Sequence, residues 1–146
     1  MRRMGLLLFY IAVLVLGGCS YTATSVNYLN VTQGDLSKEI LAYFESVEAD
    51  NGAHLYMDNA NNSMFVYFNS SNVVQGEKAE ILTDFDVDIE KDVLNILYTS
   101  EETTDLSSSS SEHSRIYRVN LNKEYDIVKL FHNGKEVSFR SVSGGE

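Results

Sequence analysis

The sequence predicts an α+β fold, in which one N-terminal amphipathic helix packs on a mainly antiparallel β-sheet or on a small β-sandwich. The first supporting observation is a segment between Thr32 and Gly52 whose apolar residues recur at helical spacing. The second is that the chain after Gly52 alternates apolar and polar residues over short stretches, as β-strands do. The third is the pair Asn133-Gly134, which is typical of a tight hairpin turn. We expect a single domain at residues 32–140.

The N-terminal segment has the layout of a secretory signal peptide. Arg2 and Arg3 are followed by an uncharged apolar run at residues 6–16. A signal peptide carries an apolar region of about 7–15 residues, whereas a transmembrane helix needs about 20. We therefore expect residues 1–18 to be cleaved and not to remain as a membrane span.

The end of this segment, Leu16-Gly17-Gly18-Cys19, resembles the lipobox of bacterial lipoprotein precursors. The resemblance implies that Leu16, Gly17 and Gly18 are recognised by a lipoprotein signal peptidase. It also implies that Cys19 is linked to diacylglycerol and becomes the first residue of the mature protein, whose new amino group is often acylated. The resemblance covers only residues 1–20, and the mature domain is placed in no family on its sequence.

A lipidated Cys19 would hold the protein at the extracytoplasmic face of the bacterial cell membrane, with the lipid bilayer as its partner through diacylglyceryl-Cys19. Two acyl chains give about the anchoring that stable attachment requires, at ~0.8 kcal/mol per buried CH₂. Two alternatives remain open. Cys19 could be an ordinary thiol beside a conventional cleavage site, or residues 1–18 could stay as an uncleaved anchor.

The composition limits the kinds of partner and site. Removal of residues 1–18 takes away two arginines and leaves nine basic and twenty-one acidic side chains, a net charge of −12. Such a charge opposes nucleic acid and anionic lipid headgroups and favours basic proteins, cationic peptides or divalent cations, although solubility alone also explains it. Cys19 is the only cysteine, so its lipidation leaves no thiol for a disulfide or a thiolate metal site.

The mature chain begins with a polar tether at residues 19–31, whose end, residues 26–31, is a candidate for a short first strand. The helix follows. Thr32 and Asp35 fit a capping box, and Asp50-Asn51-Gly52 supplies the left-handed residues that end a helix. The apolar stripe of the helix consists of Leu36, Ile40, Tyr43, Phe44 and Val47.

The pattern after the helix predicts strands at residues 53–57, 64–69, 80–90, 93–99 and 115–121. The strand at 64–69 is apolar on both faces, since Met64, Val66 and Phe68 alternate with Phe65 and Tyr67. We expect it to lie in the centre of the sheet and to be covered on each side.

The strand at 80–90 has an acidic face, formed by Asp84, Asp86, Asp88 and Glu90. Four carboxylates on one face repel one another, so the face should be hydrated or should meet cations. The spacing resembles the start of a calcium loop, but an EF-hand needs glycine at its sixth position and glutamate at its twelfth. Ile89 and Asn95 stand there instead. We assign no metal site and keep Asp84, Asp86 and Asp88 as weak candidates.

The C-terminal third contains a loop and a hairpin. Residues 101–112 are acidic and serine-rich, which predicts a mobile loop between strands. Residues 141–146 are expected to fray. The turn at Asn133-Gly134 fixes the register of the hairpin, pairing His132 with Lys135, Leu130 with Val137 and Val128 with Phe139.

No catalytic motif is present, so we assign no catalytic residue and no cofactor. His54, His113 and His132 lie in separate segments, without the i, i+4 pair of a zinc protease helix. We expect a non-enzymatic lipoprotein that binds or modulates a protein or another envelope component, and no nucleic acid. The alternatives are a small envelope enzyme of the wall-hydrolase type, using an acidic residue and a histidine brought together by the fold, or a weak cation-responsive sensor.

Overall fold

The computed structural model describes residues 26–104 and 113–145. The predicted signal peptide, its lipobox Leu16-Gly17-Gly18-Cys19 and the first part of the tether lie outside the described residues. Most of the predicted loop at 101–112 lies outside them too, as does the last residue of the chain. The first three residues of that predicted loop belong instead to a strand that ends at Thr103.

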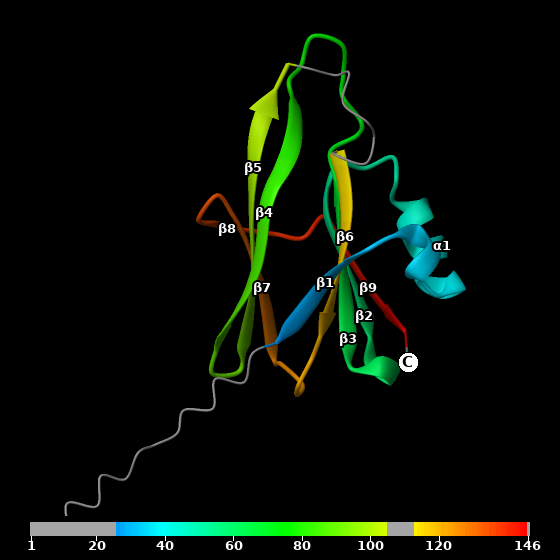
Figure 1. Cartoon of the computed structure of the whole chain (residues 1–146), viewed down its shortest axis with the longest axis vertical. Helices are drawn as coiled ribbons and strands as arrows, with labels where there is room; N and C mark the ends of the chain where they lie inside the picture. Colours follow the sequence, from blue (N-terminus) through cyan, green and yellow to red (C-terminus); the bar gives the residue numbers. More distant parts are fainter. Residues whose placement is uncertain (1–25, 105–112, 146) are drawn as a thin grey trace, which may run out of the picture.

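The described residues form nine strands in two sheets that pack face to face (Figure 1). The five-stranded sheet has the order β1 (Asn27–Val31), β6 (Ser114–Asn120), β3 (Ser63–Asn69), β2 (Gly52–Asp58) and β9 (Ser141–Gly145). The four-stranded sheet has the order β4 (Ala79–Glu90), β5 (Val93–Thr103), β7 (Ile127–His132) and β8 (Lys135–Val137). Neighbouring strands are antiparallel except for β2 with β9 and β5 with β7, which are parallel.

The predicted α+β class is wrong, because the described chain is mainly β. Its main core lies between the two sheets and not between a helix and a sheet. The buried members of this core are Ala53, Leu55, Met64, Val66, Phe68, Tyr117 and Val119 from one sheet and Leu82, Phe85, Leu94, Ile96 and Leu130 from the other. The rings of Phe85 and Tyr117 stack across the interface, with centroids 3.9 Å apart. Each sheet therefore buries its apolar face mainly against the other sheet.

The single α-helix of the described residues, α1 (Lys38–Ser46), lies on the outer face of the five-stranded sheet (Figure 1). Ile40 and Phe44 are its buried residues. They form a second, smaller core with Tyr56, Phe65, Tyr67 and Ile116. The predicted fold gave the helix too large a share of the core, because the apolar stripe of the helix is the clearest periodic pattern in the sequence.

The N-terminus of α1 is displaced from the predicted cap. The main-chain N–H of Thr32 donates to Asp35 Oδ2 at 2.8 Å, but this pair closes a 3₁₀ turn, η1 (Gln33–Asp35). The helix itself is capped by Ser37, whose hydroxyl oxygen accepts from the N–H of Ile40 at 3.4 Å. A second 3₁₀ turn, η2 (Asn59–Asn61), joins β2 to β3.

The prediction for the central strand is confirmed, since every residue of β3 is buried. The predicted hairpin register is also confirmed for Leu130 with Val137 and for His132 with Lys135. Asn133 and Gly134 have φ of 49° and 79°, as a two-residue turn of this type requires. The ladder ends at Val137, so it does not reach the pair expected farther along.

The expected fraying at 141–146 does not hold for Ser141–Gly145, which form β9 beside β2. β2 and β9 approach each other very closely at the C-terminal end of β9. A Cβ on Gly144 would lie 3.1 Å from the carbonyl oxygen of Met57, and one on Gly145 would lie 2.6 Å from the Tyr56 hydroxyl. The two glycines allow the strand to approach β2, although on sequence they look like a flexible end.

Candidate functional site

The carboxylates of β4 project from the outer face of the four-stranded sheet. Asp84, Asp86, Asp88 and Glu90 are exposed, whereas Phe85 between them belongs to the main core. Among residues 26–104 and 113–145, none of these four carboxylates takes part in an ion pair. Water or an external cation at this face would reduce their mutual repulsion.

Two of these carboxylates also protect an exposed sheet edge. β4 is the outermost strand of its sheet. Asp84 Oδ1 accepts from the N–H of Phe85 at 2.9 Å, and Asp86 Oδ1 accepts from the N–H of Val87 at 2.8 Å. Satisfied edge donors discourage pairing with a strand of another molecule.

Apolar side chains lie next to the carboxylates on the same face. The strand register places Asp86 opposite Leu97, and Leu97 opposite Phe131. A shallow depression of about 100 Å³ lies here, with Asp84, Asp86, Leu97, Thr99, Phe131 and Gly134 in its lining. We define the acidic face as the outward side chains Asp84, Asp86, Asp88, Glu90, Val93, Leu97, Ile127 and Phe131. Asn95 and Lys129 also point outward between them, and Lys129 is ion-paired with Glu136.

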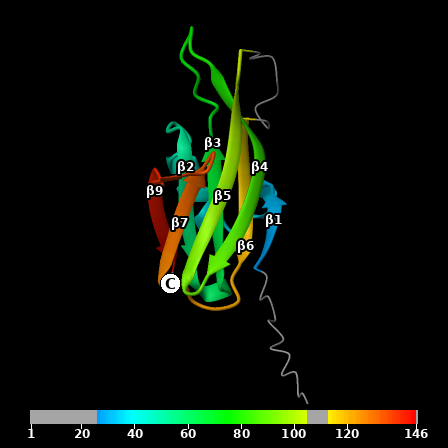
Figure 2. The same cartoon turned by 90° about the vertical axis from the view of Figure 1, so that its left-hand side faces the viewer.

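The acidic face is not covered by another element of the described chain. Figure 2 shows β4, β5 and β7 facing the viewer, with the five-stranded sheet behind them and no helix in front. The five-stranded sheet, by contrast, carries α1 on its outer side. Ile127 is 49 % exposed, although sheet faces with aliphatic and aromatic side chains are usually covered.

The structure does not gather the weak metal candidates into a site. Asp84, Asp86 and Asp88 stand at alternate positions along one strand and so point outward in a line. In the part of the chain that the structure describes, no group of three or more His, Cys, Asp or Glu residues could hold a metal ion.

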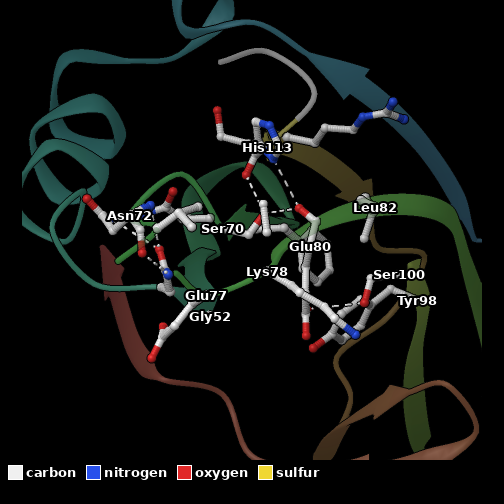
Figure 3. A pocket seen from close by; sticks show the side chains of 17 residues that line it. Gly52, Ser70, Asn72, Glu77, Lys78, Glu80, Leu82, Tyr98, Ser100 and His113 are labelled. Carbon is white, nitrogen blue, oxygen red and sulfur yellow. Dashed lines mark hydrogen bonds between the residues drawn. The ribbon is translucent and has the colours of Figure 1, made fainter. Parts of the chain in front are cut away.

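A second concave region, the end cavity, lies between the two sheets at one end of the sandwich (Figure 3). Its volume is about 320 Å³. The lining includes Phe68, Ser70, Lys78, Glu80, Leu82, Tyr98, Ser100, His113 and Arg115. Apolar residues of the core thus meet polar and charged residues at the open end of the sandwich.

The position of Glu80 in this cavity results from a β-bulge. Simple alternation would place Glu80 on the same face as Asp84. The register of β4 shifts between Leu82 and Asp84, so that Leu82 and Phe85 both point into the core. Glu80, two residues before Leu82, therefore points inward and lines the end cavity.

Glu80 and His132 both contact the hydroxyl of Ser100. Ser100 Oγ donates to Glu80 Oε2 at 3.2 Å and lies 2.6 Å from His132 Nε2. Because Ser100 Oγ donates its proton to Glu80, Nε2 of His132 contacts Oγ as an N–H donor. A catalytic histidine would instead accept the serine proton. This arrangement does not activate Ser100 as a nucleophile.

Tyr98 completes this side of the cavity. Its ring stacks on His132 with centroids 4.5 Å apart and an angle of 1° between the planes. Burial, followed by the negative charge of Glu80, raises the pKa of Tyr98 to about 12. The phenol is therefore neutral at physiological pH and acts as a hydrogen-bonding group and a flat apolar wall.

The other two histidines have structural contacts. His54 is fully buried, and its Nε2 lies 3.0 Å from the Asp50 carbonyl oxygen. A carbonyl only accepts, so Nε2 carries the proton and Nδ1 accepts from Ser141 Oγ at 2.7 Å. Ser141 Oγ in turn accepts from the Tyr43 hydroxyl at 2.7 Å, which ties β9, β2 and α1 together. His113 is buried beside the end cavity, with Nδ1 3.2 Å from the Glu80 carbonyl oxygen.

The sequence pattern predicts the carboxylates of the acidic face but not the end cavity. The signal that could have revealed the cavity is a change of character along the inward-facing positions. On β5, Tyr98 is followed at the next inward position by Ser100, and on β6, Tyr117 is preceded by Arg115. Ser100 and Arg115 therefore occupy inward-facing positions that lie beyond the end of the apolar core.

Within the described ranges, no helix is long and apolar enough to cross a membrane. Comparison of the chain with models of protein families, with curated proteins and with solved structures gives no match.

Proposed function

We propose that this chain is a bacterial lipoprotein, anchored through Cys19 at the extracytoplasmic face of the cell membrane, which binds another protein without catalysing a reaction. The lipobox supports the anchor. The acidic face supports the binding role, because it combines carboxylates without ion-pair partners in the described residues with uncovered apolar side chains. This combination is the observation on which the proposal depends.

The chemistry of the acidic face defines the partner. Lysine or arginine side chains of a partner would meet Asp84, Asp86 and Asp88, and their aliphatic stems would lie on Leu97 and Phe131. The depression of about 100 Å³ is large enough for one such side chain but not for a separate small-molecule ligand. The partner surface is therefore cationic and partly apolar. Electrostatic attraction would speed its association and make binding sensitive to salt.

Site-specific photocrosslinking in cells tests the binding role. A photoreactive amino acid at Thr99, at the rim of the depression, should give a discrete protein adduct, whereas one at Lys38 on α1 should not give that adduct. The adduct should fall at least about tenfold when the carboxylates are neutralised, because the partner's cations lose their attraction. The neutralised variant is Asp84→Asn/Asp86→Asn/Asp88→Asn.

A matched control removes the same charge elsewhere, as Glu45→Gln/Glu124→Gln/Asp126→Asn. All three of these side chains are exposed and lie outside the acidic face. The control variant should keep the adduct. An adduct that survives the triple change at the acidic face, or that falls equally in the control, would show that this face does not select the partner.

A further inference from the structure

The end cavity has the form of a small-molecule site that is separate from the acidic face. Its base is apolar, with Phe68 and Leu82 buried and Tyr98 half-buried. Its volume of about 320 Å³ falls at the lower end of the range for ligand pockets, about 300–1,000 Å³. The ligand should therefore be small and should have an apolar part.

The cavity is lined by the carboxylates of Glu77 and Glu80 and by the cations of Lys78 and Arg115, and Glu80 and Arg115 are the two that lie on strands of different sheets. Glu80 comes from β4 of the four-stranded sheet, and Arg115 comes from β6 of the five-stranded sheet. Arg115 has the same strand parity as Tyr117 and Val119, which point into the core, so it belongs to the inward face. Figure 3 shows Glu80 beside Ser100 and Tyr98 at one wall of the cavity.

Neither charge is neutralised by an ion pair within the described residues. Glu80 and Arg115 do not pair with each other, and the ion-paired cation of the cavity rim, Lys78, is bound to Glu102 at 2.5 Å. The carboxylate of Glu80 accepts from Ser100. A cation and an anion that face one cavity without meeting are complementary to a ligand that carries both charges.

We propose that the end cavity binds a small zwitterion, namely a free α-amino acid with an apolar side chain. The ammonium group would be held by Glu80 and the carboxylate by Arg115, whose planar guanidinium can bind it with two hydrogen bonds. The apolar side chain would lie against Phe68 and Tyr98. This site is independent of the acidic face, so either proposal can fail without the other.

Calorimetric titration of the full mature chain in detergent micelles tests this inference, with L-leucine and L-phenylalanine as the probes. Phenethylamine, which lacks the carboxylate, and 3-phenylpropionate, which lacks the ammonium, are the matched probes. Both amino acids should bind, and removal of either charged group from the probe should weaken binding at least about tenfold. This comparison needs no variant, so it remains decisive if a variant fails to fold.

Two substitutions then test which charged residue of the cavity binds which charged group of the ligand. Arg115→Gln should reduce the affinity for L-phenylalanine to that for phenethylamine, and Glu80→Gln should reduce it to that for 3-phenylpropionate. Lys135→Gln and Glu124→Gln make the same charge changes at exposed positions outside the cavity and should leave binding unchanged. Two results would overturn the inference. One is the absence of binding by both amino acids up to about 10 mM, and the other is equal affinity for phenethylamine and L-phenylalanine.

Discussion

The Ser141→Ala variant should unfold more readily than the natural protein, because the buried Nδ1 of His54 loses its hydrogen-bond donor. His54 is 0 % exposed, and Ser141 Oγ lies 2.7 Å from its Nδ1. A buried acceptor without a partner costs about 1–3 kcal/mol, and Tyr43 also loses the acceptor for its hydroxyl. We expect the free energy of unfolding to fall by about 2 kcal/mol, and Tm to fall by roughly 8 °C.

Urea and thermal unfolding of the full chain measure this change. Ser143→Ala removes the same atoms from the same strand at a hydroxyl that has no hydrogen bond in the described residues, so it should alter stability by less than about 0.5 kcal/mol. Tyr43→Phe should cost about 1 kcal/mol, and its combination with Ser141→Ala should cost less than the sum because the two residues share one bond. Equal stabilities for Ser141→Ala and Ser143→Ala, or a strictly additive double variant, would refute this account of His54.

Two further predictions concern the same region and the aromatic residues. Gly145→Ala should destabilise the protein by about 1–3 kcal/mol in urea unfolding, since a Cβ would lie 2.6 Å from the hydroxyl of buried Tyr56; an unchanged midpoint would show that β9 can move away without cost. Burial raises the pKa values of Tyr56 and Tyr98 to about 12, with added contributions from Glu39 at Tyr56 and from Glu80 at Tyr98. Because the unfolded phenols ionise near 10, their contribution to stability is complete below pH 10 and should decline as the pH rises from 10 to 12; ultraviolet titration in which all tyrosines ionise near 10 would contradict this.

The parts of the fold that could be predicted depend on local patterns. The turn Asn133-Gly134 fixes its own hairpin, so the register of Leu130 with Val137 follows from the turn alone. The central position of β3 follows from a strand that is apolar on both faces. In each case the information lies within a few neighbouring residues.

The parts that could not be predicted depend on contacts between distant segments. β9 pairs with β2 in parallel, joining Leu55 to Val142 across most of the chain, and its own sequence has little strand propensity. The packing of the second sheet could not be predicted either, because β4 and β5 form a long hairpin whose apolar face could have packed on a helix or on a sheet. The class of the fold was therefore decided by tertiary packing, which overrode the clear local signal of the helix.

The candidate sites divide in the same way. The acidic row was visible because Asp84, Asp86 and Asp88 alternate with apolar residues in the sequence itself. The end cavity was not visible, because it combines residues of β3, β4, β5 and β6 at the ends of two sheets. A single bulge at residues 82–84 reverses the side on which Glu80 lies, and the sequence carries no clear mark of that bulge.

Intact mass combined with membrane fractionation tests the central claim most directly, for the natural sequence and for Cys19→Ala in a bacterial host. The natural protein should lose residues 1–18, gain the mass of a lipid and sediment with membranes, whereas the variant should gain no lipid and should not sediment. If both proteins are soluble and carry no lipid, Cys19 is an ordinary thiol and the proposed function loses its location.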